Sequence, residues 1–94
     1  MMTEDPYALA LKIVEQVRAR YHSLTYSILS RDSSTEVRWF QYPILCIIYE
    51  DGVLVMPCLT SVDYVSLPIN ESVSTEAGDR VIGFIKDTNK TAYE

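Results

Sequence analysis

The chain has 94 residues, a formal net charge of −5, and 48 % hydrophobic against 22 % charged side chains. A chain of this length forms one domain around a single core, and its apolar content excludes a disordered protein. Residues 50–94 carry eight acidic and three basic side chains, whereas residues 1–49 carry five of each. Without the basic stripe that phosphate binding needs, we expect no nucleic-acid partner. The acidic balance fits a basic protein partner, or it serves solubility alone.

Neither an export signal nor a membrane span is expected from the apolar pattern. Residues 1–7, MMTEDPY, lack the basic region and apolar run of a secretory signal. The longest apolar run, Tyr42 to Tyr49, is interrupted at once by Glu50-Asp51-Gly52 and is far shorter than the ~20 residues that cross a bilayer. The sequence therefore predicts a cytoplasmic protein with no membrane partner.

A helix is predicted from residue 5 to about residue 22. Asp5 is a good N-cap, and Pro6 suits the first helical position. Apolar residues recur at spacings of three and four, which is typical of one helical stripe: Tyr7, Ala10, Val14, Val17, Tyr21, Leu24 and Ile28. Residues 24–30 also alternate in the manner of a strand, which we favour. A helix that continues to residue 29 is the alternative.

A polar turn is predicted over residues 30–36, followed by a strand over residues 37–42. In this strand Val37, Trp39 and Gln41 would share one face. The opposite face would carry Arg38, Phe40 and Tyr42.

Residues 41–59, QYPILCIIYEDGVLVMPCL, predict a β-hairpin, because Asp-Gly between apolar runs is a strong hairpin signal. A two-residue Asp51-Gly52 loop would pair Ile48 with Val55 and Cys46 with Pro57. The two cysteines, Cys46 and Cys58, would then lie on opposite faces as free thiols. A three-residue loop centred on Gly52 would instead oppose them and permit a disulfide.

The remaining chain predicts two further strands, at residues 62–67 and 80–86, separated by a polar loop over residues 70–79. Residues 87–94 are predicted to be a frayed tail. The fold class is therefore α+β: one domain, residues 1–94, with an N-terminal helix packed on an antiparallel β-meander of four to six strands. One helix cannot cover such a sheet. We expect the uncovered face to curl on itself or to be buried in a homodimer or hetero-complex.

No catalytic residue, metal site or cofactor is predicted. His22 is the only histidine, so a catalytic triad or a two-histidine metal site cannot form within one chain. Cys46 lies in an apolar run that disfavours a reactive thiolate. The three glycines are isolated, so no phosphate-binding loop exists. Asp63 interrupts an apolar segment and is the one candidate for a buried acid, although a turn or edge position is the simpler interpretation.

The candidate partner-binding residues are Arg38, Trp39, Phe40 and Tyr42, because Trp, Tyr and Arg are frequent at interface hot spots. If Trp39 faces the helix as a core residue, the other three would form an outward patch. The leading hypothesis is a non-enzymatic protein-interaction module that acts through a sheet face or edge as an oligomer. Adaptors, chaperone-like proteins and small inhibitor or immunity proteins share this profile. The alternative is a binder of small apolar ligands, with a pocket lined by Tyr42, Tyr49, Tyr64 and Phe84. An enzyme ranks third.

Overall fold

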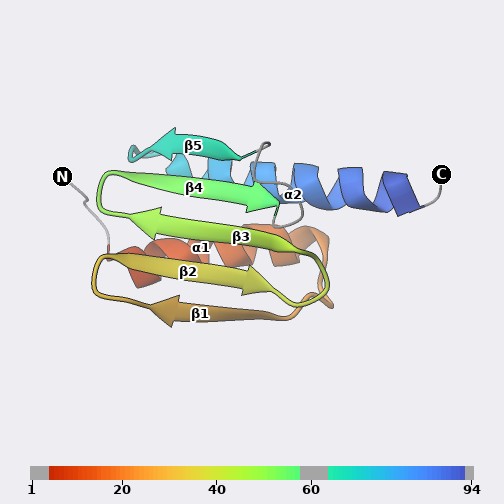
Figure 1. Ribbon diagram of the computed structural model, residues 1–94, viewed down its shortest axis with the longest axis horizontal. Helices are drawn as coiled ribbons and strands as arrows, with labels where there is room; N and C mark the ends of the chain where they lie inside the picture. The colour runs from red at the N-terminus through yellow and green to blue at the C-terminus, as the bar shows by residue number, and fades with distance from the viewer. Residues whose placement is uncertain (1–4, 58–63, 93–94) are drawn as a thin grey trace.

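The computed structural model describes residues 5–57 and 64–92. Its elements follow the order α1, β1 to β5, α2 (Figure 1). Their bounds are α1 Pro6–Arg20, β1 Tyr26–Ser30, β2 Ser34–Trp39, β3 Ile44–Tyr49, β4 Gly52–Pro57, β5 Val65–Pro68 and α2 Val73–Ala92. The α+β class, the N-terminal helix and the antiparallel meander are confirmed.

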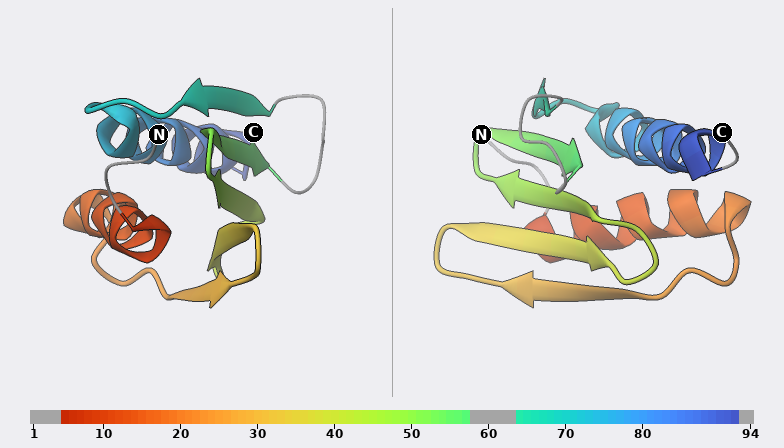
Figure 2. Two further views of the ribbon diagram at one scale, coloured as in Figure 1. Left: turned by 90° about the vertical axis from the view of Figure 1, so that its left-hand side faces the viewer. Right: turned by 45° about the vertical axis from the view of Figure 1, so that its right-hand side comes forward.

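The five strands form one antiparallel sheet in the order β1-β2-β3-β4-β5. Both helices lie on the same side of this sheet, and the sheet curves around them (Figure 2). Helix α1 packs on β1, β2 and β3, while α2 packs on β3, β4 and β5. The molecule therefore has two layers, with helices covering one face of the sheet only.

Helix α1 begins and ends close to the predicted residues. Pro6 occupies its first turn, Arg18 and Arg20 its last, and the N–H of Tyr21 donates to the carbonyl oxygen of Val17 at 3.0 Å. Asp5 is the N-cap, although its side chain makes no capping hydrogen bond. The strand that follows is β1, so the alternative of a helix reaching residue 29 is wrong.

The hairpin of β3 and β4 is confirmed, but its predicted register is wrong by two residues. Ile48 pairs with Val53, and Cys46 pairs with Val55 rather than with Pro57. Gly52 already belongs to β4 and does not have a positive φ, so Glu50 and Asp51 make the turn. A shift of two preserves the alternation of a strand, so each side chain lies on the face that the sequence predicted.

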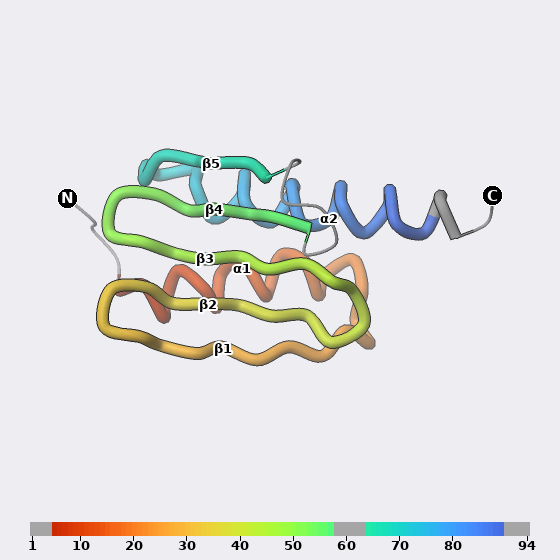
Figure 3. Tube along the Cα trace, viewed as in Figure 1, coloured from red at the N-terminus to blue at the C-terminus, as the bar shows by residue number. Residues whose placement is uncertain are grey.

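The largest error of the sequence-based prediction concerns the C-terminal third. Residues 80–86 are not a strand, residues 73–79 are not a loop, and residues 87–92 are not a frayed tail, because all of them belong to α2. The side chain of Asn70 accepts a hydrogen bond from the N–H of Ser72 at 2.8 Å, just before the helix begins. Over its 20 residues α2 is about 30 Å long, and it projects beyond the end of the sheet (Figure 3).

The core lies between the sheet and the two helices. Helix α1 contributes mainly Ile13, Val14 and Val17, and α2 contributes Val81 and Ile85. The strands contribute residues that face the helices in register: Val37, Trp39, Ile44, Cys46, Ile48, Val53, Val55 and Leu67. Because α2 completes the helical layer, the single predicted helix does not have to cover the sheet alone.

Candidate functional site

The candidate site is the face of the sheet that points away from the helices, called here the outer face. Residues directly opposed in neighbouring strands share a face. Glu36 is opposed to Leu29 on β1 and to Ile47 on β3, and Ile47 is opposed to Leu54 on β4. The next row joins Ser27, Arg38, Leu45 and Met56. No element packs on these rows within residues 5–57 and 64–92.

The centre of the outer face is apolar. Ile47 is almost fully buried by its neighbours alone, and Leu45, Leu54 and Met56 are each half-buried around it. At the margins Leu29 on β1 and Tyr49 on β3 expose 46 % and 39 % of their surface. Contiguous apolar surface of this kind marks interaction sites in soluble domains.

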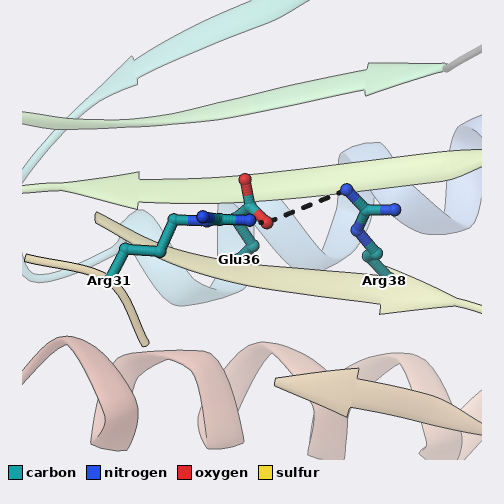
Figure 4. Close-up of polar contacts among 3 residues, drawn as sticks. All are labelled: Arg31, Glu36 and Arg38. Atoms are coloured by element: carbon teal, nitrogen blue, oxygen red, sulfur yellow. Dashed lines mark ion pairs between the residues drawn. The ribbon is translucent and has the colours of Figure 1, made fainter. Parts of the chain in front are cut away.

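The charged residues of the outer face gather around Glu36 on β2. Arg31 Nε lies 3.5 Å and an Arg38 terminal nitrogen 3.9 Å from the same oxygen, Glu36 Oε2 (Figure 4). The Glu36 side chain is only 13 % exposed, while both arginines are more than half exposed. These separations exceed hydrogen-bond length, and Glu36 Oε2 has no hydrogen-bond partner. Two partly exposed arginines therefore flank one nearly buried carboxylate at this corner.

The four predicted partner-binding residues do not form one patch. Arg38 lies on the outer face, as predicted, and Phe40, 67 % exposed, lies beyond the end of β2. Trp39 is buried against the helices, where its ring lies 6.0 Å from that of Tyr26. Trp39 is therefore a core residue, which was the condition for an outward patch of the other three.

Tyr42 was predicted to face outward with Arg38, and this is wrong. It lies between β2 and β3, is half-buried against the core, and its hydroxyl donates to Asn89 Oδ1 of α2 at 2.9 Å. The strand ends at Trp39, so the alternation that would have placed Tyr42 outward does not extend to it. Tyr42 therefore ties the projecting half of α2 to the sheet.

The predicted ligand pocket does not form from its four residues. Tyr42 packs on the core side, whereas Tyr49 lies on the outer face opposite Ser34. Tyr64 is exposed just before β5, and Phe84 packs on the core from α2. A hollow of about 520 Å³ is present elsewhere, beside the C-terminal half of α1.

Two of the titratable groups singled out in the sequence, His22 and Cys46, lie within the described residues. His22 is exposed after α1, where its carbonyl oxygen accepts a hydrogen bond from Arg18 at 3.1 Å. Cys46 is a free thiol within the core, and burial raises its pKa from 9.0 to about 12. A thiol with this pKa is not a nucleophile at neutral pH. Cys58 and Asp63 lie outside the described residues, and so does the predicted relation between the two cysteines.

Comparison with known proteins gives no relative: no family model, no curated protein and no solved structure matches this chain. Within the described part of the chain, neither helix is long and apolar enough to cross a membrane. Function must therefore be argued from the surface.

Sequence reasoning predicted that an uncovered sheet face would be buried by a partner, but it did not assign the apolar residues of the hairpin to that site. The signal was present, because Leu45, Ile47, Leu54 and Met56 make both arms of the hairpin apolar on both faces. Such strands are typical of a sheet that is covered on two sides. Here the helices cover only one.

Proposed function

We propose that this chain is a non-enzymatic protein-interaction module and that its outer face binds a protein partner. The proposal rests on one observation: the two central strands present Leu45, Ile47, Leu54 and Met56 on a face without a covering element among the described residues. Burial of apolar surface contributes roughly 25 cal/mol per Å², so covering these side chains is favourable.

The charge on the outer face specifies the partner's chemistry. Its only acidic residue in β1 to β5 is Glu36, which already faces Arg31 and Arg38. The Arg38 side chain is 60 % exposed, so it can bind a further anionic group. The partner is therefore an apolar protein surface edged by a carboxylate that reaches Arg38. Charge pairs of this kind at an interface chiefly set specificity and the rate of association.

The basic partner suggested by the net charge of −5 belongs to another surface, since the excess of acidic residues lies in residues 50–94. The buried, unbonded Cys46 thiol is compatible with the reducing cytoplasm, where we place this function. A small-ligand pocket is the second candidate, although the residues proposed for it lie on different faces of the sheet: Tyr42 and Phe84 pack on the core, and Tyr49 lies on the outer face.

The test is affinity capture with chemical crosslinking from the native cell, using the intact chain and two variants. Arg38→Glu reverses one charge on the outer face, and Leu54→Lys replaces a central apolar side chain. Both positions are partly solvent-exposed. Because Arg38→Glu brings a second carboxylate beside Glu36, circular dichroism must show that both variants keep the fold. We expect a discrete partner to be captured by the wild type and lost with each variant.

Arg80→Glu is the matched control, because Arg80 is exposed on α2, on the opposite layer of the molecule. It changes the net charge by the same amount as Arg38→Glu. Retention of the partner by Arg80→Glu supports the proposal. Equal capture by wild type, Arg38→Glu and Leu54→Lys would refute it.

A further inference from the structure

Strand β1 forms an edge of the sheet with free backbone groups. The backbone carbonyl oxygen of Thr25 accepts a hydrogen bond from the N–H of Phe40 at 3.1 Å. The N–H of Arg31 donates to the backbone carbonyl oxygen of Ser34 at 2.7 Å. Hydrogen-bonded pairs alternate along an antiparallel ladder, so the odd-numbered residues of β1 bond to β2. The N–H and C=O groups of Tyr26, Ile28 and Ser30 therefore point away from the sheet.

Within the described residues, this edge lacks three common devices that prevent strand pairing. Its sequence, Tyr26 to Ser30, contains no charged residue and no proline, and its one-to-one register with β2 excludes a bulge. Natural edge strands normally carry at least one of these devices. The opposite edge strand, β5, is shorter and ends at Pro68.

A hollow of about 520 Å³ accompanies the β1 edge on the helix side. Its lining includes Leu11, Val14, Glu15 and Arg18 of α1, together with His22 and with Tyr26 of β1. The Arg18 guanidinium lies over the Tyr26 ring at 5.7 Å from its centre. Tyr7, 47 % exposed, and Leu11 leave apolar surface uncovered along this side of α1.

We propose that a second copy of this chain docks here, with its β1 antiparallel to the first β1, so that the two sheets become one of ten strands. The side chains of Tyr26 and Ile28 face the helices in each copy. On pairing, they would project into the gap between the two α1 helices and fill the hollow. This mode differs from partner binding at the outer face and does not depend on it.

The charges on α1 favour a second copy over an unrelated strand. Helix α1 runs antiparallel to β1 (Figure 1), so a twofold axis through paired β1 strands makes the two α1 helices antiparallel. The Asp5 end of each helix then lies beside the Arg18 and Arg20 end of the other. Opposite charges and opposite ends of the helix dipoles meet at both places. The uncharged β1 adds no repulsion.

Dimerisation would also enlarge the outer face to the area that a standard protein–protein interface buries. Five strands about 4.8 Å apart and roughly 17 Å long give one sheet face a projected area of about 400 Å². This is half of the ~800 Å² that each partner buries in a standard interface. Joining two sheets doubles this area without covering it.

Sedimentation velocity over a range of concentrations, extending to high micromolar, tests the proposal. Ser30→Pro removes an outward N–H while leaving the β2 ladder intact, and Ser30→Ala is its matched control. We expect the wild type and Ser30→Ala to dimerise, and Ser30→Pro to raise the dissociation constant by about tenfold or more. Circular dichroism would check that both variants fold.

A charge exchange tests the antiparallel arrangement separately. At low salt, Asp5→Arg and Arg18→Glu should each weaken dimerisation, and the chain carrying both should recover it. A wild type that stays monomeric at every concentration would overturn the proposal. So would a dimer that survives Ser30→Pro, or one that is lost only with Leu54→Lys, since the latter would place the second copy on the outer face.

Discussion

Gln16 of α1 lies directly on Gly78 of α2. Its Nε2 atom donates to the carbonyl oxygen of Thr75 at 2.9 Å and to Asp79 Oδ1 at 2.7 Å. A Cβ atom added at Gly78 would lie only 2.7 Å from Gln16 Cδ. The absence of a side chain at Gly78 therefore lets one glutamine join the two helices.

We predict that Gly78→Ala fails to stabilise the protein although alanine is the better helix former. The ~1 kcal/mol gained in helix propensity would be offset by losing two hydrogen bonds of roughly 1 kcal/mol each. In a Gln16→Ala background, Gly78→Ala should instead stabilise by about 1 kcal/mol. Urea unfolding of the four chains measures the difference.

Gly83 supplies the control for this cycle. It also lies in α2, but an added Cβ would meet nothing within 4 Å. We expect Gly83→Ala to stabilise by about 1 kcal/mol with or without Gln16. If Gly78→Ala and Gly83→Ala behaved alike in the wild-type background, Gln16 would not join the helices as described.

Gly52 is required for space rather than for its conformation. Its φ is not positive, but a Cβ atom there would lie 3.0 Å from the carbonyl oxygen of Leu67 on β5. Because that contact is with backbone, it cannot be relieved by a rotamer change. We predict that Gly52→Ala destabilises the protein by roughly 1–3 kcal/mol. Hydrogen exchange should show the loss first in β5; unchanged protection there would contradict the prediction.

The hydroxyl of Tyr42 should contribute measurably to the attachment of α2. Tyr42→Phe removes only its hydrogen bond to Asn89, at a cost of about 1 kcal/mol. Tyr49→Phe, on the outer face, is the matched control and should be neutral. Faster amide exchange in the second half of α2 for Tyr42→Phe alone is the expected result, and equal exchange in both variants would argue against this role.

Cys46 should make stability depend on alkaline pH. Burial raises the pKa of the Cys46 thiol from 9.0 to about 12 in the folded state. The contribution of the neutral thiol to the free energy of unfolding is therefore complete below pH 9. This contribution falls as pH rises from 9 through 12, because the unfolded chain loses the proton first. In a Cys58→Ser background, Cys46→Ala should show a shallower loss of unfolding free energy over this range. Parallel pH profiles would contradict the assignment.

The sequence predicted correctly those elements whose cap or turn residues favour the same structure as the tertiary packing. Asp5-Pro6 marked α1, and the turn beside Gly52 marked the hairpin of β3 and β4. Helix α2 was missed because Gly78 and Gly83, with several Ser and Thr residues, lower its helix propensity. The signal that could have revealed it is the spacing of four in Val73, Ala77, Val81 and Ile85. Packing against α1 and the sheet outweighs the weak propensity.

The candidate site was less predictable than the fold, because the pattern of one strand does not show what covers it. Arg38 was placed correctly on the outer face, but Tyr42 was assigned by alternation beyond the end of β2. From sequence alone, Leu45 and Leu54 fit either a second covering layer or the surface that binds a partner. Only the arrangement of both helices on one side reveals that the described residues leave this face uncovered.

Photo-crosslinking in the native cell tests the central claim most directly. A photoreactive amino acid is placed at Leu54, in the centre of the outer face, or at Arg80, on the exposed side of α2. We predict a discrete crosslinked protein from position 54 that is absent from position 80. Crosslinks from position 80 but none from position 54 would show that the outer face is not the binding surface.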